Sequence, residues 1–368
     1  MDVASTRIAV AMSGGVDSSV AAAWLKERGR DVVGVHMRLF DLPRDACRSD
    51  ELRNCCGTRA RRDAGAVAAA LGIPFYTADF RRTFEKTVVA DFISEYRRGR
   101  TPNPCLRCNR FLKFGLLLSR VGRLGAGFVA TGHYARTEYD RASGRWLLLK
   151  GIDPQKDQSY FLCAMTQDQL SRTIFPIGDM KKTEVRAYAG RLDLPVAHKT
   201  ESQEICFIPD DDYGRFLRER APDAFRPGPI VDVSGRTIGR HGGIAGFTIG
   251  QRKGMGIAAP RPLYVVRIDA ASNTIVAGPN EALFEKRMAV SGLNWIAVEG
   301  LRGPREASVR IRYRHAEARA VLHPVEDNRL TVEFDRAQRA ITPGQAAVFY
   351  DGDIVLGGAT IDSAGGGS

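Results

Sequence analysis

Length, composition and charge narrow the classes to which this protein can belong. The chain has 368 residues, 44% hydrophobic and 26% charged, which predicts a globular protein of two or three domains and excludes a disordered one. It has no run of about 18 apolar residues and no secretory signal pattern, so we expect a cytoplasmic protein without a membrane partner. The formal net charge of +12 fits either a polyanionic partner or solubility alone.

Apolar runs alternate with helical patterns over the first two hundred residues. Buried strands are predicted at 7–12, 31–37, 74–80 and 127–135, and the segments between them carry apolar residues at helical spacing. This alternation predicts an α/β fold with a doubly wound, mostly parallel sheet. Ligands then bind at the carboxyl ends of its strands.

Past residue 205 the pattern changes to short strands separated by turn signals. Strands such as 247–251 and 307–314 are predicted, and those after residue 285 have the spacing of an antiparallel barrel. We therefore expect a catalytic domain at 1–208, a small β-rich domain at 209–284, a C-terminal β-barrel at 285–362 and a flexible tail at 363–368.

The segment MSGGVDSS at 12–19 lies where the first strand should pass into the first helix. Two glycines allow a tight turn that brings backbone N–H groups close to an anion, and Ser13, Ser18 and Ser19 add hydroxyl groups. A glycine turn with an N-cap is the simpler alternative. The string SGGVDSS, however, resembles the pyrophosphate loop of the N-type ATP pyrophosphatases, which have an adenine nucleotide alpha hydrolase-like fold. The resemblance implies ATP binding with Mg²⁺, for which Asp17 is a candidate ligand.

Two cysteines lie three residues apart in TPNPCLRCNRFLKFG at 101–115. The chain has no second CxxC, so a four-thiolate zinc site is disfavoured for Cys105 and Cys108. A cysteine can carry sulfur as a persulfide, and a second thiol can then release that sulfur through a disulfide. We expect Cys163 to be a buried apolar residue and Cys55 and Cys56 to be structural or loop residues. The sequence around Cys47 indicates no function.

Further motifs extend a family resemblance along nearly the whole chain. TGHYAR (131–136), KDQSYFL (156–162), TESQEICFI (200–208), GFTIGQRKGMGI (246–257), RIRYR (310–314) and PGQAAVFYDGD (343–353) follow in the order found in the tRNA-specific 2-thiouridylases. The sequence resembles this family of ATP-dependent sulfurtransferases. They replace the C2 oxygen of a wobble uridine in tRNA by sulfur.

The resemblance implies roles for particular residues. Cys108 would be the catalytic thiol and Cys206 the persulfide carrier, and Asn103, Pro104 and Cys105 would face the target base. The residues implied to bind ATP are Ala11, Met12, Ser13, Gly14, Gly15, Val16, Asp17, Ser18, Met37 and Gly132. Those implied to contact tRNA elsewhere are His133, Lys156, Asp157, Gln158, Arg312, Tyr313 and Gln345. The sulfur donor would be a cysteine desulfurase or a sulfur-relay protein.

Cys105 departs from the family pattern, in which this position is commonly Asp. Two interpretations stay open. Either the Cys105 thiol replaces the carboxylate in acid/base work, or Cys105, Cys108 and Cys206 ligate a [4Fe-4S] iron–sulfur cluster that holds the incoming sulfide.

Basic residues support an RNA partner. A period of two over 307–314 predicts Arg310, Arg312 and Arg314 on one face of a strand, where they could meet a phosphate backbone. Other functions remain as alternatives: an amidating synthetase with the same loop, which would need no thiols, and a tRNA-binding or redox protein without turnover.

Overall fold

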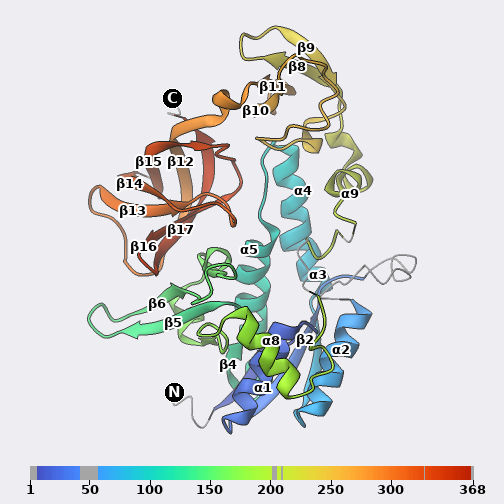
Figure 1. Ribbon diagram of the computed structural model, residues 1–368, viewed down its shortest axis with the longest axis vertical. Helices are drawn as coiled ribbons and strands as arrows, with labels where there is room; N and C mark the ends of the chain where they lie inside the picture. The colour runs from blue at the N-terminus through green and yellow to red at the C-terminus, as the bar shows by residue number, and fades with distance from the viewer. Residues whose placement is uncertain (1–5, 42–56, 201–204, 209, 327, 366–368) are drawn as a thin grey trace. The chain divides into compact units, whose positions relative to one another are not determined.

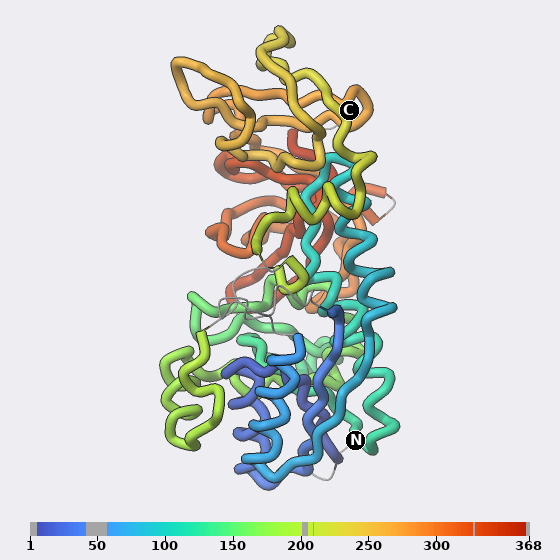
Figure 2. Tube along the Cα trace, turned by 90° about the vertical axis from the view of Figure 1, so that its right-hand side faces the viewer, coloured from blue at the N-terminus to red at the C-terminus, as the bar shows by residue number. Residues whose placement is uncertain are grey.

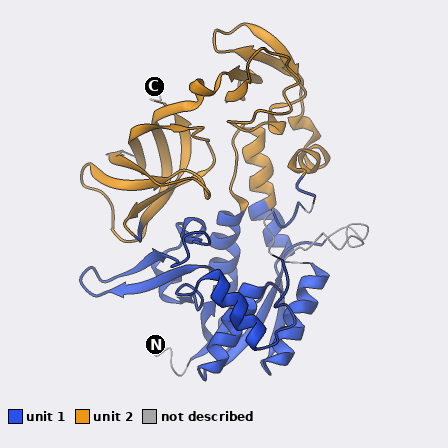
Figure 3. Cartoon of the chain, in the orientation of Figure 1, with its two compact units in different colours: residues 1–88, 105–211, 353–355 blue, residues 89–104, 212–352, 356–368 orange. Residues whose placement is uncertain are grey.

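The computed structural model describes residues 6–41, 57–200, 205–208, 210–326 and 328–365. The chain forms two compact units (Figure 3). Unit 1 comprises residues 1–88, 105–211 and 353–355, and unit 2 comprises residues 89–104, 212–352 and 356–368. The domain boundaries expected from the sequence stay a prediction. Cys47, Cys55 and Cys56 lie outside the described residues.

Unit 1 is built on a five-stranded sheet with the order β3-β2-β1-β4-β7. Of these strands, β2 and β4 are labelled in Figure 1. All four neighbouring pairs are parallel. The strands are β1 (Arg7–Ala11), β2 (Val32–Arg38), β3 (Phe75–Asp79), β4 (Ala126–Ala130) and β7 (Thr173–Ile174). The prediction of a parallel α/β sheet is confirmed. Strand order reverses between β1 and β4, so the loops that follow these two strands meet at one edge, where such folds bind ligands.

Helices α1 (Val16–Glu27), α2 (Thr58–Ala70) and α8 (Lys182–Arg191) share one core with the sheet. Alternate residues of β1, such as Ile8 and Val10, belong to this core. Ala9, which points to the opposite face, is also fully buried. Both faces of the sheet are therefore covered, and the course from β1 through α1 to β2 is the dark blue part of the trace in Figure 2.

The remaining elements of unit 1 are mostly short. They are α3 (Arg81–Phe84), η2 (Glu85–Val89, shared with unit 2), α5 (Pro104–Cys108), η3 (Asn109–Leu117), α6 (Leu118–Arg120), η4 (Val121–Leu124), η5 (Ser159–Leu162), α7 (Gln167–Ser171), and the antiparallel hairpin β5 (Ala135–Asp140) with β6 (Arg145–Lys150). The segments η2 and η3 are π-helical, a form that is frequent at functional sites.

Two strand predictions in unit 1 were wrong in detail. Residues 127–135 do not form one strand, because β4 ends at Ala130 and the chain turns before β5 begins. The strand at 74–80 is not buried, because β3 lies at the edge of the sheet and Tyr76 is half exposed. As an edge strand, β3 has a neighbouring strand on one side only, so its side chains are partly or fully exposed.

Unit 2 contains a small mixed sheet in the order β10-β11-β8-β9. The elements of this part are α4 (Ala90–Arg97), α9 (Tyr213–Arg220), η6 (Pro222–Ala224), β8 (Gly228–Asp232), β9 (Thr237–His241), η7 (Ile244–Gly246), β10 (Tyr264–Asp269) and β11 (Thr274–Gly278). Aromatic side chains join the two helices, with Phe92 against Phe216 at 6.1 Å and Tyr96 stacked on Tyr213 at 5.3 Å. The strand predicted at 247–251 was wrong, because these residues form an irregular loop after η7.

The second part of unit 2 is a closed antiparallel barrel of six strands, as the sequence predicts. Its order is β12-β15-β14-β13-β16-β17, and pairing of β12 with β17 closes it. After η8 (Asn280–Leu283), the strands are β12 (Phe284–Trp295), β13 (Arg305–Arg310), β14 (Ala318–Val325), β15 (Arg329–Arg339), β16 (Ala346–Asp351) and β17 (Ile354–Ala364). Val290, Val332 and Phe349 are fully buried in its core.

Two predictions for the barrel need correction. Strand β13 ends at Arg310, so Arg312 and Arg314 lie in the bend and turn after it and do not continue one strand face with Arg310. At the other end, β17 includes Ser363 and Ala364, which were assigned to a flexible tail. Residues 366–368 lie outside the described residues.

Candidate active site

The loop between β1 and α1 forms an anion cradle. Gly14 has φ of +77°, and a Cβ there would lie 2.3 Å from the carbonyl oxygen of Ala60, so only glycine fits. The Ser18 hydroxyl accepts the Ser13 N–H at 3.2 Å and donates to the Gly15 carbonyl at 3.2 Å. Gly15 is the N-cap of the 12-residue helix α1 and provides no side-chain cap. The first N–H groups of α1 therefore lack a capping side chain and suit a phosphate.

The loop after β4 lies directly against this cradle. A Cβ on Gly132 would lie 2.5 Å from the backbone nitrogen of Ser18, so the two backbones touch. On the neighbouring strand β2, His36 Nδ1 lies 3.0 Å from the Met12 carbonyl oxygen, and Met37 is buried next to it. The structure thus brings the residues proposed for ATP binding to the carboxyl edge of three adjacent strands.

Two lysines far away in the sequence reach the cradle. Lys182 Nζ donates to Asp17 Oδ1 at 2.6 Å, and the Tyr134 hydroxyl donates to the same oxygen at 2.8 Å. Lys199 Nζ donates to the Gly14 carbonyl at 2.8 Å and to Asp63 Oδ2 at 2.5 Å. Sequence reasoning missed both lysines, because each joins the loop from more than 160 residues away. Each lysine thus neutralises a carboxylate beside the cradle, so that neither carboxylate cancels the positive end of the helix.

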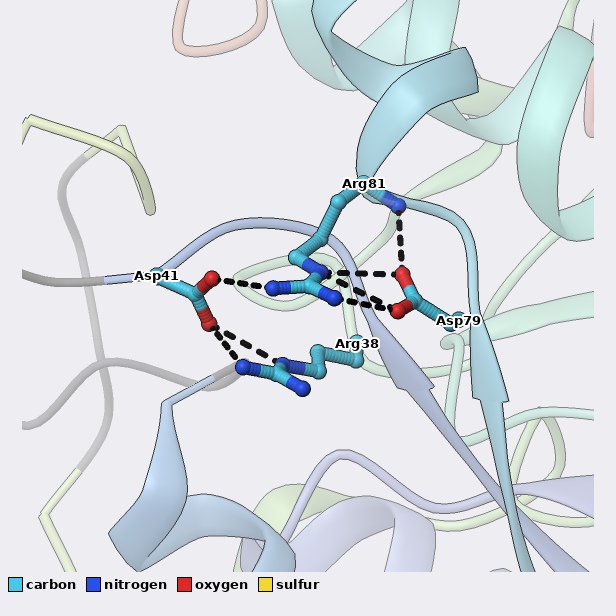
Figure 4. A network of polar contacts seen from close by, with 4 residues as sticks. All are labelled: Arg38, Asp41, Asp79 and Arg81. Carbon is cyan, nitrogen blue, oxygen red and sulfur yellow. Dashed lines mark hydrogen bonds and ion pairs between the residues drawn. The ribbon is translucent and has the colours of Figure 1, made fainter.

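An ion-pair network fixes the same edge of the sheet farther from the cradle (Figure 4). Arg81 bonds to Asp79 through Nη2 at 2.6 Å and also to Asp41, which accepts from Arg38 at 2.6 Å. Hydrogen bonds from Arg81 lower the pKa of Asp79 to about 2. All four side chains are 38–52% exposed, so water screens the network and we assign it an orienting role only.

The three cysteines proposed for catalysis differ in exposure. Cys105 is exposed and Cys108 is buried on the five-residue helix α5, and Cys206 is half-buried. Arg107, the neighbour of Cys108, donates to the Thr87 carbonyl at 3.4 Å. Phe207, the neighbour of Cys206, packs edge-on against Phe84 at 5.5 Å. Both thiol-bearing segments therefore contact one helical segment, α3–η2, at positions three residues apart.

The described residues contain no group of three or more His, Cys, Asp or Glu side chains that could hold a metal ion. Cys105, Cys108 and Cys206, considered for an iron–sulfur cluster, form no such group among the described residues, and the cluster stays a prediction. For Mg²⁺, the described chain offers the Asp17 carboxylate but no cage of protein ligands. Cys163 is buried as expected, and burial raises the pKa of its thiol to about 12, which leaves it unreactive.

The other residues proposed for tRNA contact in unit 1 lie on two adjoining loops. His133 Nδ1 lies 2.7 Å from Thr131 Oγ1, and burial, aided by the Lys113 charge, lowers the pKa of His133 well below 6.5. Asp157 is buried, and its carboxylate accepts from Gly151 N–H and from Ser159. Lys156 and Gln158 are partly exposed on the same loop.

In unit 2, Gln345 is attached to the segment that precedes the thiol helix. Its Nε2 donates to the Thr101 carbonyl at 2.9 Å and to the Pro102 carbonyl at 3.2 Å. Asn103 completes this segment, Pro104 is the first residue of α5, and the boundary of unit 2 falls directly after Pro104. Arg312 donates to the Arg339 carbonyl at 3.1 Å, and Tyr313 follows it in the turn after β13. The tRNA contacts implied for these residues stay a prediction.

The fold and the cradle define a class of protein. A parallel sheet with a glycine-serine loop at its switch point is the arrangement of a nucleotide-binding α/β domain. The family described as "tRNA methyl transferase HUP domain" matches residues 6–210. Two further families match later segments, "tRNA methyl transferase PRC-barrel domain" at 214–279 and "Aminomethyltransferase beta-barrel domain" at 285–361.

Similar proteins narrow the class to one family. The tRNA-specific 2-thiouridylase MnmA of Symbiobacterium thermophilum is 50% identical over 97% of this chain and 92% of its own length. The enzyme of the same name from Heliobacterium modesticaldum is 53% identical over 96% of this chain and 92% of its own length. The one from Geotalea uraniireducens is 51% identical over 97% of this chain and 95% of its own length. The chain belongs to the tRNA-specific 2-thiouridylase family.

Proposed function

We propose that the protein is an ATP-dependent tRNA sulfurtransferase that converts C2=O of a wobble uridine to C2=S. The observation that carries this proposal is identity of about half of all residues to 2-thiouridylases over nearly the full length. The phosphate cradle at the switch point supports ATP as a substrate. No helix in the described part of the chain is long and apolar enough to cross a membrane.

In the first step the cradle holds the triphosphate of ATP. Backbone N–H groups at the start of α1 stabilise the charge of the leaving pyrophosphate, and Lys182 neutralises the Asp17 carboxylate beside them. Uridine O2 attacks the α-phosphorus, a bond from O2 to phosphorus forms, and the bond to pyrophosphate breaks. A Mg²⁺ ion supplied with ATP would bind chiefly to the phosphates, with Asp17 as its candidate protein ligand.

In the second step sulfur replaces the activated oxygen. The outer sulfur of a persulfide on Cys206 attacks C2, and AMP leaves with O2. The Cys108 thiolate then attacks the inner sulfur of Cys206, which releases C2=S and leaves a Cys108–Cys206 disulfide. A dithiol, or two molecules of a monothiol, reduces that disulfide to two thiols and is itself oxidised to a disulfide, and a cysteine desulfurase or relay protein reloads the persulfide. Contact of both cysteine segments with α3–η2 supports this pairing.

The test supplies unmodified tRNA, ATP, Mg²⁺ and a persulfide donor, and measures 2-thiouridine, AMP and pyrophosphate. Cys108→Ala and Cys206→Ala should each lower thiolation by roughly 10³-fold or more. The control Cys163→Ala removes a buried thiol without a proposed role and should keep activity.

Other outcomes would contradict the proposal. Full activity of both cysteine variants indicates an amidating synthetase, and tRNA binding without pyrophosphate release indicates a binding protein. Iron and sulfide analysis of anaerobically purified protein decides whether a cluster takes part, since thiolation by iron-free protein removes that alternative.

A further inference from the structure

The carboxylate of Asp17 is held by two buried groups from other parts of unit 1. The Tyr134 hydroxyl and the Lys182 ammonium both bond to Oδ1, at 2.8 and 2.6 Å. Tyr134 is 2% exposed and Lys182 8% exposed, so water competes little for either contact. Lys182 Nζ also lies 5.8 Å from the centre of the Tyr134 ring. The three side chains form one compact cluster at the start of α1.

The backbones of Tyr134 and Lys182 are tied to one loop, residues 151–159. The Gln158 N–H donates to the Tyr134 carbonyl at 2.9 Å, and the Tyr134 N–H donates to Gln158 Oε1 at 3.1 Å. The Lys182 N–H donates to Asp153 Oδ2 at 2.9 Å. Two separate routes therefore lead from this loop to the same oxygen of Asp17.

The loop itself is braced from within. The buried Asp157 carboxylate accepts from Gly151 N–H at 3.2 Å and from Ser159 N–H and Oγ at 3.0 Å each, and the Asp157 N–H donates to the Asp153 carbonyl at 2.9 Å. A Cβ on Gly151 would lie 2.8 Å from the Tyr134 carbonyl oxygen, so the loop also packs directly on Tyr134. A displacement of the loop must therefore be passed on to Tyr134 and Lys182.

The position of these two residues matters for phosphate binding. Asp17 lies in the first turn of α1, beside the N–H groups that would bind phosphate. Two anions at one helix terminus repel each other, and a lysine on the carboxylate removes most of that repulsion. The contacts of Lys182 and Tyr134 with Asp17 therefore affect the affinity of the site for the triphosphate.

We propose that Tyr134 and Lys182 are positioning residues that couple the loop 151–159 to the ATP site. Contact of tRNA with this loop holds the cluster in this arrangement and strengthens ATP binding, and ATP strengthens tRNA binding by the same factor. This inference rests on the proposed function, which supplies tRNA as the substrate, and on the tRNA contact predicted from the sequence for residues 156–158.

The test measures the dissociation constant of an ATP analogue with a methylene bridge between the α- and β-phosphates, with and without unmodified tRNA. The ratio of the two constants is the coupling factor, and we expect about 5- to 150-fold for the wild-type chain. Tyr134→Phe and Lys182→Met should each bring the ratio close to one. The reciprocal measurement, tRNA affinity with and without the analogue, should give the same ratio.

Matched controls exist on the same pair of helices. Tyr188 and Arg191 of α8 bond to Glu27 in the last turn of α1, as Tyr134 and Lys182 bond to Asp17 in its first turn. Tyr188→Phe and Arg191→Met remove the same kinds of contact at the end of α1 remote from the cradle, and they should leave the coupling factor unchanged.

Three results would overturn the inference. These are a wild-type ratio of one, a wild-type ratio retained in both cluster variants, or complete loss of analogue binding in Tyr134→Phe, which would place the hydroxyl in the ATP site itself. The analogue is not turned over, so these outcomes are separate from a failure of thiolation, which would refute the proposed function instead.

Discussion

Gly132 is the residue at which the second loop of the site meets the first. It has no side chain, and the backbone of Ser18 occupies the space that a Cβ would need. We predict that Gly132→Ala lowers the free energy of unfolding by about 1–3 kcal/mol and ATP affinity by roughly tenfold or more, because the cradle must shift. Chemical denaturation and ATP titration measure the two effects.

The control for this prediction is Gly190→Ala. Gly190 lies in helix α8, and a Cβ there would meet nothing within 4 Å. Alanine is the better helix former, so this variant should be more stable by about 0.5–1 kcal/mol. If both alanine variants behave alike, the close approach at Gly132 has no energetic significance.

His133 gives a prediction for the dependence of stability on pH. Burial holds its pKa in the folded protein below 6.5, so the unfolded chain binds the proton more tightly. Stability from this group is complete above pH 6.5 and is lost as the pH falls toward the folded-state pKa. The unfolding free energy of His133→Gln should therefore fall less steeply between pH 7 and 5 than that of the wild type.

Urea denaturation at several pH values measures this difference. His241 and His315 also have lowered pKa values and remain in both proteins, so only the difference between the two curves reports His133. Parallel curves would mean that His133 titrates alike in the folded and unfolded chains.

At the scale of elements, Arg310 at the end of β13 forms an ion pair within the barrel. Arg310 Nη2 bonds to Glu317 Oε1 at 2.7 Å, with side chains 14% and 21% exposed, and its guanidinium lies 5.2 Å from the centre of the Tyr350 ring. Because its charge is already paired, we expect Arg310 to stabilise the barrel and not to bind RNA phosphate. Arg310→Met should lower the unfolding free energy by about 1–3 kcal/mol.

The dependence of tRNA affinity on salt separates the two roles of Arg310. A lost phosphate contact lowers the slope of log K against log salt by roughly one, whereas loss of an internal ion pair leaves the slope unchanged. We expect the unchanged slope. The exposed Arg319 on β14 is the control for stability, and Arg319→Met should change it by about 0.5 kcal/mol or less.

For the molecule as a whole, the features found from the sequence are those that depend on local patterns. The parallel sheet, the antiparallel barrel and the loop at 12–19 were predicted, because apolar runs that alternate with helical spacing, turn residues and the string SGGVDSS are each readable within a few residues. The alternation of arginine and apolar residues after Arg310 led to a wrong strand prediction. Ile311 is buried as a strand residue would be, but it lies in a bend, so the alternation does not distinguish the two conformations.

The features missed from the sequence depend on distant parts of the chain. Lys182 and Lys199 carry no local signal of phosphate binding, and only the packing of α8 and the segment after it brings them to Gly14 and Asp17. The internal use of Asp157 was missed for the same reason, since a buried carboxylate that braces a loop looks like any polar loop residue. Long-range folding decides which charges meet.

Unit 2 is made of separate stretches of the chain, and this affects how a truncated protein behaves. A protein truncated after residue 211 would keep α4 but lose Tyr213 and Phe216, the rings on which Tyr96 and Phe92 pack. Those aromatic faces would be left in water and would promote aggregation. A soluble fragment of the nucleotide domain therefore requires that residues 89–104 be replaced by a short linker. A single stop codon after residue 211 is not enough.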